Sequence, residues 1–172
     1  VDTIEKHIIV GDSGIPLPSL IYRPQGEGPF PVVLITDPAG KTAVTGEGSI
    51  SERLAREGWL VCAFDLPGRG ELTVDTGRDD SVINGVSYNL VFGAQLIGES
   101  VTGIEASAIS DVVTVLTGRE YCDASRIILA ANGIAGAAAM HAAALDTRIA
   151  GCAVFGAPSD WASVVNTREY NN

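Results

Sequence analysis

Three glycine-containing loops follow apolar stretches of the chain, and each has residues that could support chemistry. The first, at residues 38–42, reads PAGKT and ends like the Gly-Lys-Thr of a phosphate-binding P-loop. The full pattern needs a further glycine five positions before Gly40, where Ile35 stands instead. The residues after Lys41 also have the composition of a loop rather than of a helix. Phosphate binding at this loop is therefore weakly supported.

The second loop runs from Ala131 to Gly136, reads ANGIAG, and allows two interpretations. As A-x-G-x-x-G between a strand and a helix, it differs at one position from a dinucleotide-binding fingerprint. That fingerprint needs an acidic residue about 20 positions later, and residues 155–158 read FGAP. Alternatively, the loop is a nucleophile elbow, G-x-S-x-G, in which a sharp turn presents a serine. Gly133 then stands at the serine position, so the sequence predicts the turn without its nucleophile.

Further polar residues follow the predicted strands, where ligands bind in open α/β sheets. The third loop, DLPGRGE at residues 65–71, carries two of them, which we expect to pair with each other or to hold the loop. Asp65 itself is expected to be structural, at a strand end. The candidate cleft residues are Asp37, Arg69, Glu71, Ser159 and Asp160.

The pattern of apolar residues predicts the elements that position these loops. Apolar runs without polar alternation are typical of strands buried on both faces of a parallel sheet. Strands are expected at residues 4–10, 20–23, 32–35, 59–64, 127–131 and 149–155, and helices from Ser49 to near Gly58, at 100–118 and at 136–145. Residues 72–99 give no clear pattern. Alternating strands and helices indicate an α/β fold with a mostly parallel sheet and helices on both faces.

The cysteines indicate neither a disulfide framework nor a metal site. There are three cysteines and two histidines, with no C-x-x-C pair. Cys62 and Cys152 lie in apolar runs and are expected to be buried. Cys122 lies in a polar connector, REYCDASR, and is the one cysteine whose reactivity merits a test. We expect no metal and no cofactor.

Composition narrows the classes of function. Of the 172 residues, 46% are hydrophobic, which excludes a disordered chain. The formal net charge of −10 disfavours nucleic acid as a partner, because phosphate backbones would be repelled. No run of 18 uncharged apolar residues is present, so no membrane span is expected. The compartment, exported or cytoplasmic, stays undetermined.

The ordered set of these segments resembles the α/β-hydrolases of the acetyl xylan esterase-like group, which are related in style to dienelactone hydrolases. The resemblance covers about residues 15–160. Besides the elbow segment, it rests on YRPQGEGPFPVVLITDPAG, SERLAREGWLVCAFDLPGRGE, LTGREYCDASRI and AAALDTRIAG. It implies a carboxylic ester hydrolase whose sheet begins with an antiparallel pair of strands. Acetylated carbohydrate or a small ester is the implied ligand.

The same resemblance implies where the site residues would lie. The N–H of Ile134 would be the first oxyanion-hole donor, and Ala39 or Gly40 would supply the second. The nucleophile position falls on Gly133, and no histidine follows His141, so we expect a catalytically degenerate family member. Two alternatives stay open: an active hydrolase of a longer chain with a non-standard nucleophile, and a nucleotide-binding module that uses ANGIAG.

The length of the chain indicates how much of the fold is present. Residues 1–172 are expected to form a single α/β-hydrolase-like domain, the N-terminal part of the fold, truncated after the strand that follows the elbow helix. That last strand would leave an open sheet edge. We therefore expect a homo-oligomer, or pairing with a missing C-terminal segment.

Overall fold

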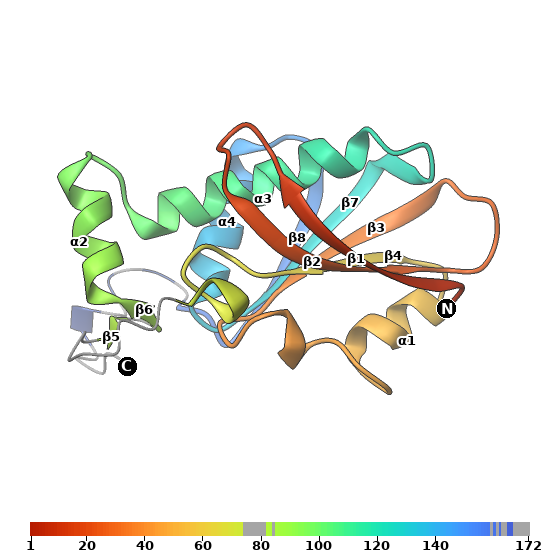
Figure 1. Cartoon of the computed structure of the whole chain (residues 1–172), viewed down its shortest axis with the longest axis horizontal. Coiled ribbons are helices and arrows are strands. Elements are labelled where there is room, and N and C mark those ends of the chain that lie inside the picture. Colours follow the sequence, from red (N-terminus) through yellow and green to blue (C-terminus); the bar gives the residue numbers. More distant parts are fainter. Residues whose placement is uncertain (74–81, 84, 159, 161, 163–164, 167–172) are drawn as a thin grey trace.

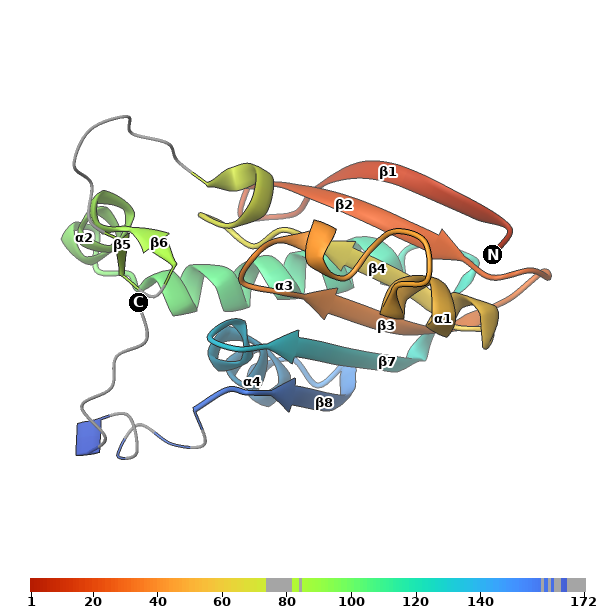
Figure 2. The ribbon, with the colours of Figure 1, turned by 90° about the horizontal axis from the view of Figure 1, so that it is seen from below.

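A six-stranded sheet forms the centre of the molecule. The computed structural model describes residues 1–73, 82–83, 85–158, 160, 162 and 165–166. The strands lie in the spatial order β1-β2-β4-β3-β7-β8 (Figure 2). Their bounds are β1 Thr3–Val10, β2 Pro16–Arg23, β3 Phe30–Thr36, β4 Leu60–Phe64, β7 Cys122–Asn132 and β8 Ile149–Phe155. All six strands expected from the apolar runs are confirmed, and β2, β3 and β7 are clearly longer than expected.

The sheet is mostly parallel, as predicted. β1 and β2 form an antiparallel hairpin, and β2 pairs antiparallel with β4. From β4 onwards the neighbouring strands β4, β3, β7 and β8 all run parallel. The carboxyl ends of these four strands therefore lie along one edge of the sheet, and the loops that follow them meet there.

Helices cover both faces of the sheet (Figure 1). α3 (Val101–Thr117) and α4 (Ala135–Leu145) pack on one face, and α1 (Ile50–Arg56) packs on the other. α1 begins at the expected cap, because the Ser49 side chain accepts a hydrogen bond from the N–H of Glu52. Five of the seven alanines of α4 are buried and let the helix approach the sheet closely, as their small side chains predict.

The part of the chain without a clear sequence pattern forms a small cap. We use this name for β5 (Val82–Ile83), β6 (Val86–Ser87) and α2 (Tyr88–Leu96). Figures 1 and 2 show the cap beyond the carboxyl ends of β3 and β7. α2 has no concentrated apolar face, and Leu96 is 87% exposed. This lack of periodicity explains why the sequence alone did not predict α2.

α3 buries two carboxylates together with its apolar face. Asp111 accepts hydrogen bonds from the N–H groups of Asp12 and Ser13, at 3.1 and 3.2 Å, and another from the Ser13 hydroxyl. Gly11 lies so close that a Cβ built on it would be 2.3 Å from Cγ of Asp111. The carboxylate thus attaches the turn between β1 and β2 to the helix. Glu105, the second carboxylate, pairs with Arg69 of the loop that follows β4.

One of the expectations for the cysteines is wrong, and Cys122 does not lie in a connector. Cys62 is buried as expected, but Cys152 is exposed, because β8 is the last strand of the described sheet. Cys122 is also buried, since β7 begins at this residue and its side chain joins the main core. Burial raises the pKa of Cys122 to about 11 and that of Cys62 to about 12, which makes both thiols poor nucleophiles.

These positions predict the order in which the cysteines react. In the native chain, iodoacetamide should modify Cys152 first and leave Cys62 and Cys122 unmodified, because reagent reaches the exposed thiol alone. Peptide mass spectrometry after timed labelling would measure this order, and labelling in denaturant should modify all three. Preferential modification of Cys122 would contradict the described start of β7.

Candidate functional site

Strand register brings three polar residues together at the carboxyl edge of the sheet. Ile35 of β3 pairs with Ala63 of β4 on one side and with Ala130 of β7 on the other. Two residues further along each chain segment come Asp37, Asp65 and Asn132. Because the strands are parallel and in register, these side chains start from adjacent positions. The candidate site is built on this row.

The carboxylate of Asp65 ties together the loops that follow β3 and β4. Its Oδ1 accepts the backbone N–H of Lys41 at 2.6 Å, and its Oδ2 accepts Nζ of Lys41 at 2.7 Å. Oδ2 also accepts the backbone N–H of Glu71 at 3.0 Å. Asp65 is 1% exposed, so its charge is stabilised by these donors rather than by water. The structural role expected for Asp65 is confirmed.

Lys41 is buried within this cluster and is not free to bind phosphate. Its Nζ contacts both Asp65 and Glu71. Burial lowers the pKa of Lys41, but the hydrogen bonds and charges of the two carboxylates outweigh it, and the net pKa is raised. The ammonium therefore stays charged and paired. The residues from Lys41 to Ala43 form a short 3₁₀ helix instead of the longer helix of a P-loop.

Two glycines allow the loops to approach each other. Gly70 has φ +57°, and a Cβ built on it would lie 2.3 Å from Oδ1 of Asp65. Gly40 has φ +89°, and its Cβ would lie 2.5 Å from Cα of Gly70. Any side chain at either position would displace the Asp65 carboxylate or separate the loops.

The turn between β7 and α4 has the tight backbone predicted for an elbow. Gly133 has φ +51°, in the left-handed region, and its N–H donates to the carbonyl of Phe155 at 2.7 Å. A Cβ built on Gly133 would lie 3.3 Å from Cγ of Pro38. A Cβ on Gly136 would lie 2.6 Å from Cβ of Ala157. Close packing therefore requires a glycine at position 136, and the positive φ together with Pro38 favours a glycine at position 133.

The three backbone N–H groups considered as oxyanion donors differ in their availability. The N–H of Ala39 donates to Oδ1 of Asp37 at 2.8 Å, and that of Gly40 donates to the Asp37 carbonyl at 2.9 Å. The other carboxylate oxygen of Asp37 accepts Nδ2 of Asn132 at 3.0 Å, which ties this loop to the elbow. Among the described residues, the N–H of Ile134 donates to no protein group, so it is the available donor.

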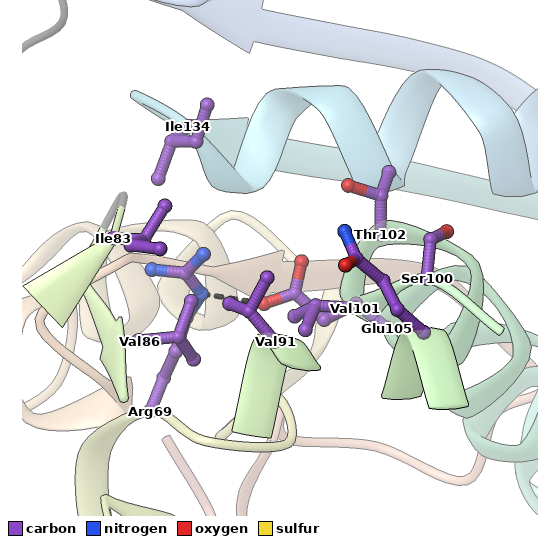
Figure 3. A pocket seen from close by; sticks show the side chains of 10 residues that line it. Arg69, Ile83, Val86, Val91, Ser100, Val101, Thr102, Glu105 and Ile134 are labelled. Atoms are coloured by element: carbon purple, nitrogen blue, oxygen red, sulfur yellow. Dashed lines mark hydrogen bonds and ion pairs between the residues drawn. The ribbon is translucent and has the colours of Figure 1, made fainter. Parts of the chain in front are cut away.

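A cavity of about 170 Å³ lies between the cap, α3 and the start of α4 (Figure 3). Arg69 and Glu105 line it, and Nε of Arg69 donates to Oε1 of Glu105 at 2.6 Å. Arg69 therefore pairs with Glu105, whereas Glu71 pairs with Lys41. Arg69 and Glu71 were expected either to pair with each other or to hold their loop. They do not pair with each other, but each holds the loop through its own partner. Burial raises the pKa of Glu105, although the Arg69 guanidinium opposes that effect.

Ser159, Asp160 and the chain's two histidines are not among the residues that line this cavity. Asp160 is exposed, and Ser159 lies outside the described residues. His141 is exposed on α4, and its Nδ1 lies 2.7 Å from the carbonyl oxygen of Ala137. His7 is on β1, at the far edge of the sheet from β7 and β8, where its Nε2 lies 2.8 Å from Oε2 of Glu5.

The described ranges offer neither a metal centre nor a membrane-spanning helix. No group of three or more His, Cys, Asp or Glu side chains in these ranges has an arrangement that could hold a metal ion. None of the helices described in these ranges combines the length and apolar character needed to cross a membrane.

Solved structures of other proteins share the fold of this chain. No protein-family model matches the chain. A 2,6-dihydropseudooxynicotine hydrolase of Paenarthrobacter nicotinovorans is 29% identical over 157 residues, which cover 91% of this chain and 36% of that protein. The crystal structure of a 2,6-dihydroxy-pseudo-oxynicotine hydrolase superimposes with a TM-score of 0.59 at 24% identity, over 87% of this chain and 35% of that one. The acetyl xylan esterase of Paenibacillus sp. R4 superimposes with a TM-score of 0.62 at 22% sequence identity, over 87% of this chain and 47% of that one.

The chain has the α/β-hydrolase fold. It spans just over a third of the length of the curated relative, so its sheet and helices correspond to part of that protein. Within the α/β-hydrolase fold, the mostly parallel six-stranded sheet and its two layers of helices agree with the fold class predicted from the sequence.

Glu105 is the site residue that sequence reasoning missed. Glu105 falls within the apolar stretch of α3, where the helical periodicity of the apolar residues predicted the buried positions around it. One signal was present, because Glu105 lies four residues from both Val101 and Ile109 and thus on the buried face. A carboxylate on such a face needs a buried partner, but nothing local identifies Arg69, which lies 36 residues away.

The Asp65 cluster predicts a large loss of stability on a small change. Asp65→Asn keeps the size of the side chain but removes the buried charge that faces Lys41. We expect a loss of about 3 kcal/mol in the free energy of unfolding, typical of breaking a buried ion pair. Urea denaturation followed by circular dichroism would measure it.

Glu71→Gln is the matched control, because the Glu71 side chain is 66% exposed. The free energy of unfolding should fall by less than about 1 kcal/mol in this variant, as for other exposed ion pairs. Equal losses for the two variants would show that Asp65 does not anchor the loops.

Proposed function

We propose that this chain forms the elbow part of a small-ester-binding site in an α/β-hydrolase-fold protein, and that it does not itself hydrolyse the ester. The observation that carries the proposal is the turn at Gly133. Its left-handed backbone and the available N–H of Ile134 fit an elbow that can hold a carbonyl oxygen. Gly133 has no side chain to attack that carbonyl, so binding without turnover is the expected behaviour.

The missing base supports the same proposal. A serine nucleophile needs a general base within hydrogen-bond reach, and in the triad of α/β-hydrolases that base is a histidine. Of the chain's two histidines, His7 lies on the edge strand β1, and His141 is exposed on α4 with Nδ1 beside a backbone carbonyl. Removing the nucleophile of such a triad costs about a factor of 10⁶ in rate. The N–H of Ile134 alone would restore little of this loss.

The kind of ligand follows from the surroundings of the elbow and from the relatives. The names of the relatives describe hydrolases that act on 2,6-dihydropseudooxynicotine and on acetylated xylan. A cavity of about 170 Å³ is too small for a long polysaccharide but accepts one acyl group or one small ring. The net charge of −10 disfavours anions. A small neutral ester or an acetylated sugar unit satisfies these conditions.

Hydrolysis of p-nitrophenyl acetate tests the absence of turnover. The purified, folded chain should release p-nitrophenol no faster than buffer that contains an equal concentration of an unrelated acidic protein. Absorbance at neutral pH would measure the rate. Saturable release that scales with protein concentration would overturn the proposal and favour an active hydrolase with a non-standard nucleophile.

Substitutions at Gly133 separate the effect of a strained backbone on stability from the effect of a nucleophile on turnover. Gly133→Ser places a hydroxyl at the elbow, but we expect turnover to stay at background because no histidine lies nearby. Gly133→Ala is the matched control. Both variants should lose about 1–3 kcal/mol of stability, because a side chain is strained at φ +51°. Thermal denaturation and p-nitrophenyl acetate assays would measure the two effects.

One result of these assays would contradict the proposal. Turnover by Gly133→Ser that Gly133→Ala lacks would mean that the chain retains a working base and lacks only its nucleophile.

A further inference from the structure

The strand β8 forms one edge of the six-stranded sheet, and β1 forms the other (Figure 2). Within the described residues, no strand pairs with the outer side of β8. The carbonyl of Phe155 accepts the N–H of Gly133, so it points inwards, towards the β7 side. Because backbone groups alternate in direction along a strand, those of Cys152 and Val154 point outwards. This edge therefore presents backbone donors and acceptors that another strand can pair with.

The two edges of the sheet differ in their charge. Edge strands are commonly protected from pairing by charged side chains. β1 follows this rule, because Glu5, Lys6 and His7 lie within it. β8 reads IAGCAVF, which contains no charged residue and no proline. Asp146 and Arg148, just before β8, pair with each other at 2.6 Å. Pairing is therefore opposed by charge along β1 but not along β8.

The sequence of β8 matches itself when two copies run antiparallel. The strand has seven residues, and Cys152 is the middle one, so pairing about Cys152 overlaps the whole strand. Gly151 then lies opposite the second copy's Ala153, and Phe155 lies opposite the second copy's Ile149. Small residues thus meet near the centre, and Phe155, which is 63% exposed, gains an apolar neighbour. Because the backbone of Cys152 points outwards, the two Cys152 residues can exchange both hydrogen bonds.

We propose that two copies of this chain pair antiparallel through β8, about a twofold axis at Cys152, and join their two six-stranded sheets into one. A contact of this kind closes on itself, because the same edge of each copy is used. The charged β1 edges then lie at the two far ends of the joined sheet. The product is therefore a dimer and not a fibre. This dimer requires neither the elbow turn nor a ligand.

Analytical ultracentrifugation of the whole chain tests for the dimer. A reducing buffer prevents disulfide-linked dimers, and physiological salt screens the repulsion between two net charges of −10 beyond about 8 Å. The sedimenting mass should rise from that of the monomer to twice that value as the protein concentration increases. A mass that stays monomeric at high micromolar concentration would overturn the proposal. Species that grow without limit would overturn the twofold closure.

Charges placed at the axis test the register. Cys152→Lys and Cys152→Glu each bring like charges opposite each other, so each variant should weaken dimerisation at least about tenfold. An equimolar mixture of the two variants should form a heterodimer, because opposite charges then meet at the axis. Cys152→Ser is the matched control and should dimerise as the unmodified chain does. If both charged variants are folded by circular dichroism, undiminished dimerisation of either, or no association in the mixture, would refute pairing about Cys152.

Ile8→Lys distinguishes the two edges of the sheet, because Ile8 lies on β1 and is 70% exposed. This variant should dimerise as the unmodified chain does. Loss of the dimer would show that β1 takes part in the contact, and would overturn the pairing of β8 with itself.

Cross-linking measures the approach at the axis directly. The Cys152 side chains project from a face of the sheet, where reagents reach them, and residues paired in this way have Cα atoms about 5.5 Å apart. A short bis-maleimide should therefore link the two Cys152 thiols of the dimer. Dimeric protein that gives no linked product would overturn the register. None of these results affects the p-nitrophenyl acetate test, so the two proposals fail independently.

Discussion

The buried carboxylate of Asp65 is the interaction on which the geometry of the site depends. It stands at the end of β4 and binds the backbone and ammonium of Lys41, from the loop after β3, and the N–H of Glu71 from its own loop. A charge removed from water needs donors close by, so both loops are held against it. Gly40 and Gly70 allow the approach. The position of Pro38 beside Gly133 follows from this arrangement.

The elbow is a second constraint, and it involves backbone rather than charge. Gly133 is held by its hydrogen bond to Phe155, and Asn132 is held by Asp37. These contacts reproduce a tight strand-to-helix turn whether or not a nucleophile stands there. The likeness to hydrolases therefore describes a scaffold, whereas activity depends on the groups that the scaffold carries. In this chain the N–H of Ile134 has no acceptor among the described residues, and the Arg69–Glu105 pair lies in the wall of the cavity.

The carboxylates of α3 connect this scaffold to the rest of the fold. Asp111 holds the hairpin of β1 and β2, and Glu105 holds the loop after β4 through Arg69. One helix thus carries an apolar face and two buried charges. Such charges reduce the apolar area of the core, but each selects one partner loop. One of these charges, Glu105, lines the cavity together with residues of the cap and Ile134.

The sequence by itself determined the strands, the main helices and the elbow turn. Uninterrupted apolar runs are sufficient to predict buried parallel strands, and Ser49 and Ser100 cap helices through local hydrogen bonds. Small residues at positions 131–136 predicted the turn. Tertiary structure alone decided that Cys152 is exposed and Cys122 buried, that Arg69 pairs with Glu105, and that Asp37 uses the N–H groups of Ala39 and Gly40. The reason is physical. Local backbone preference depends on neighbours in the chain, whereas burial and ion pairing depend on which strand lies at the edge and which distant loops meet.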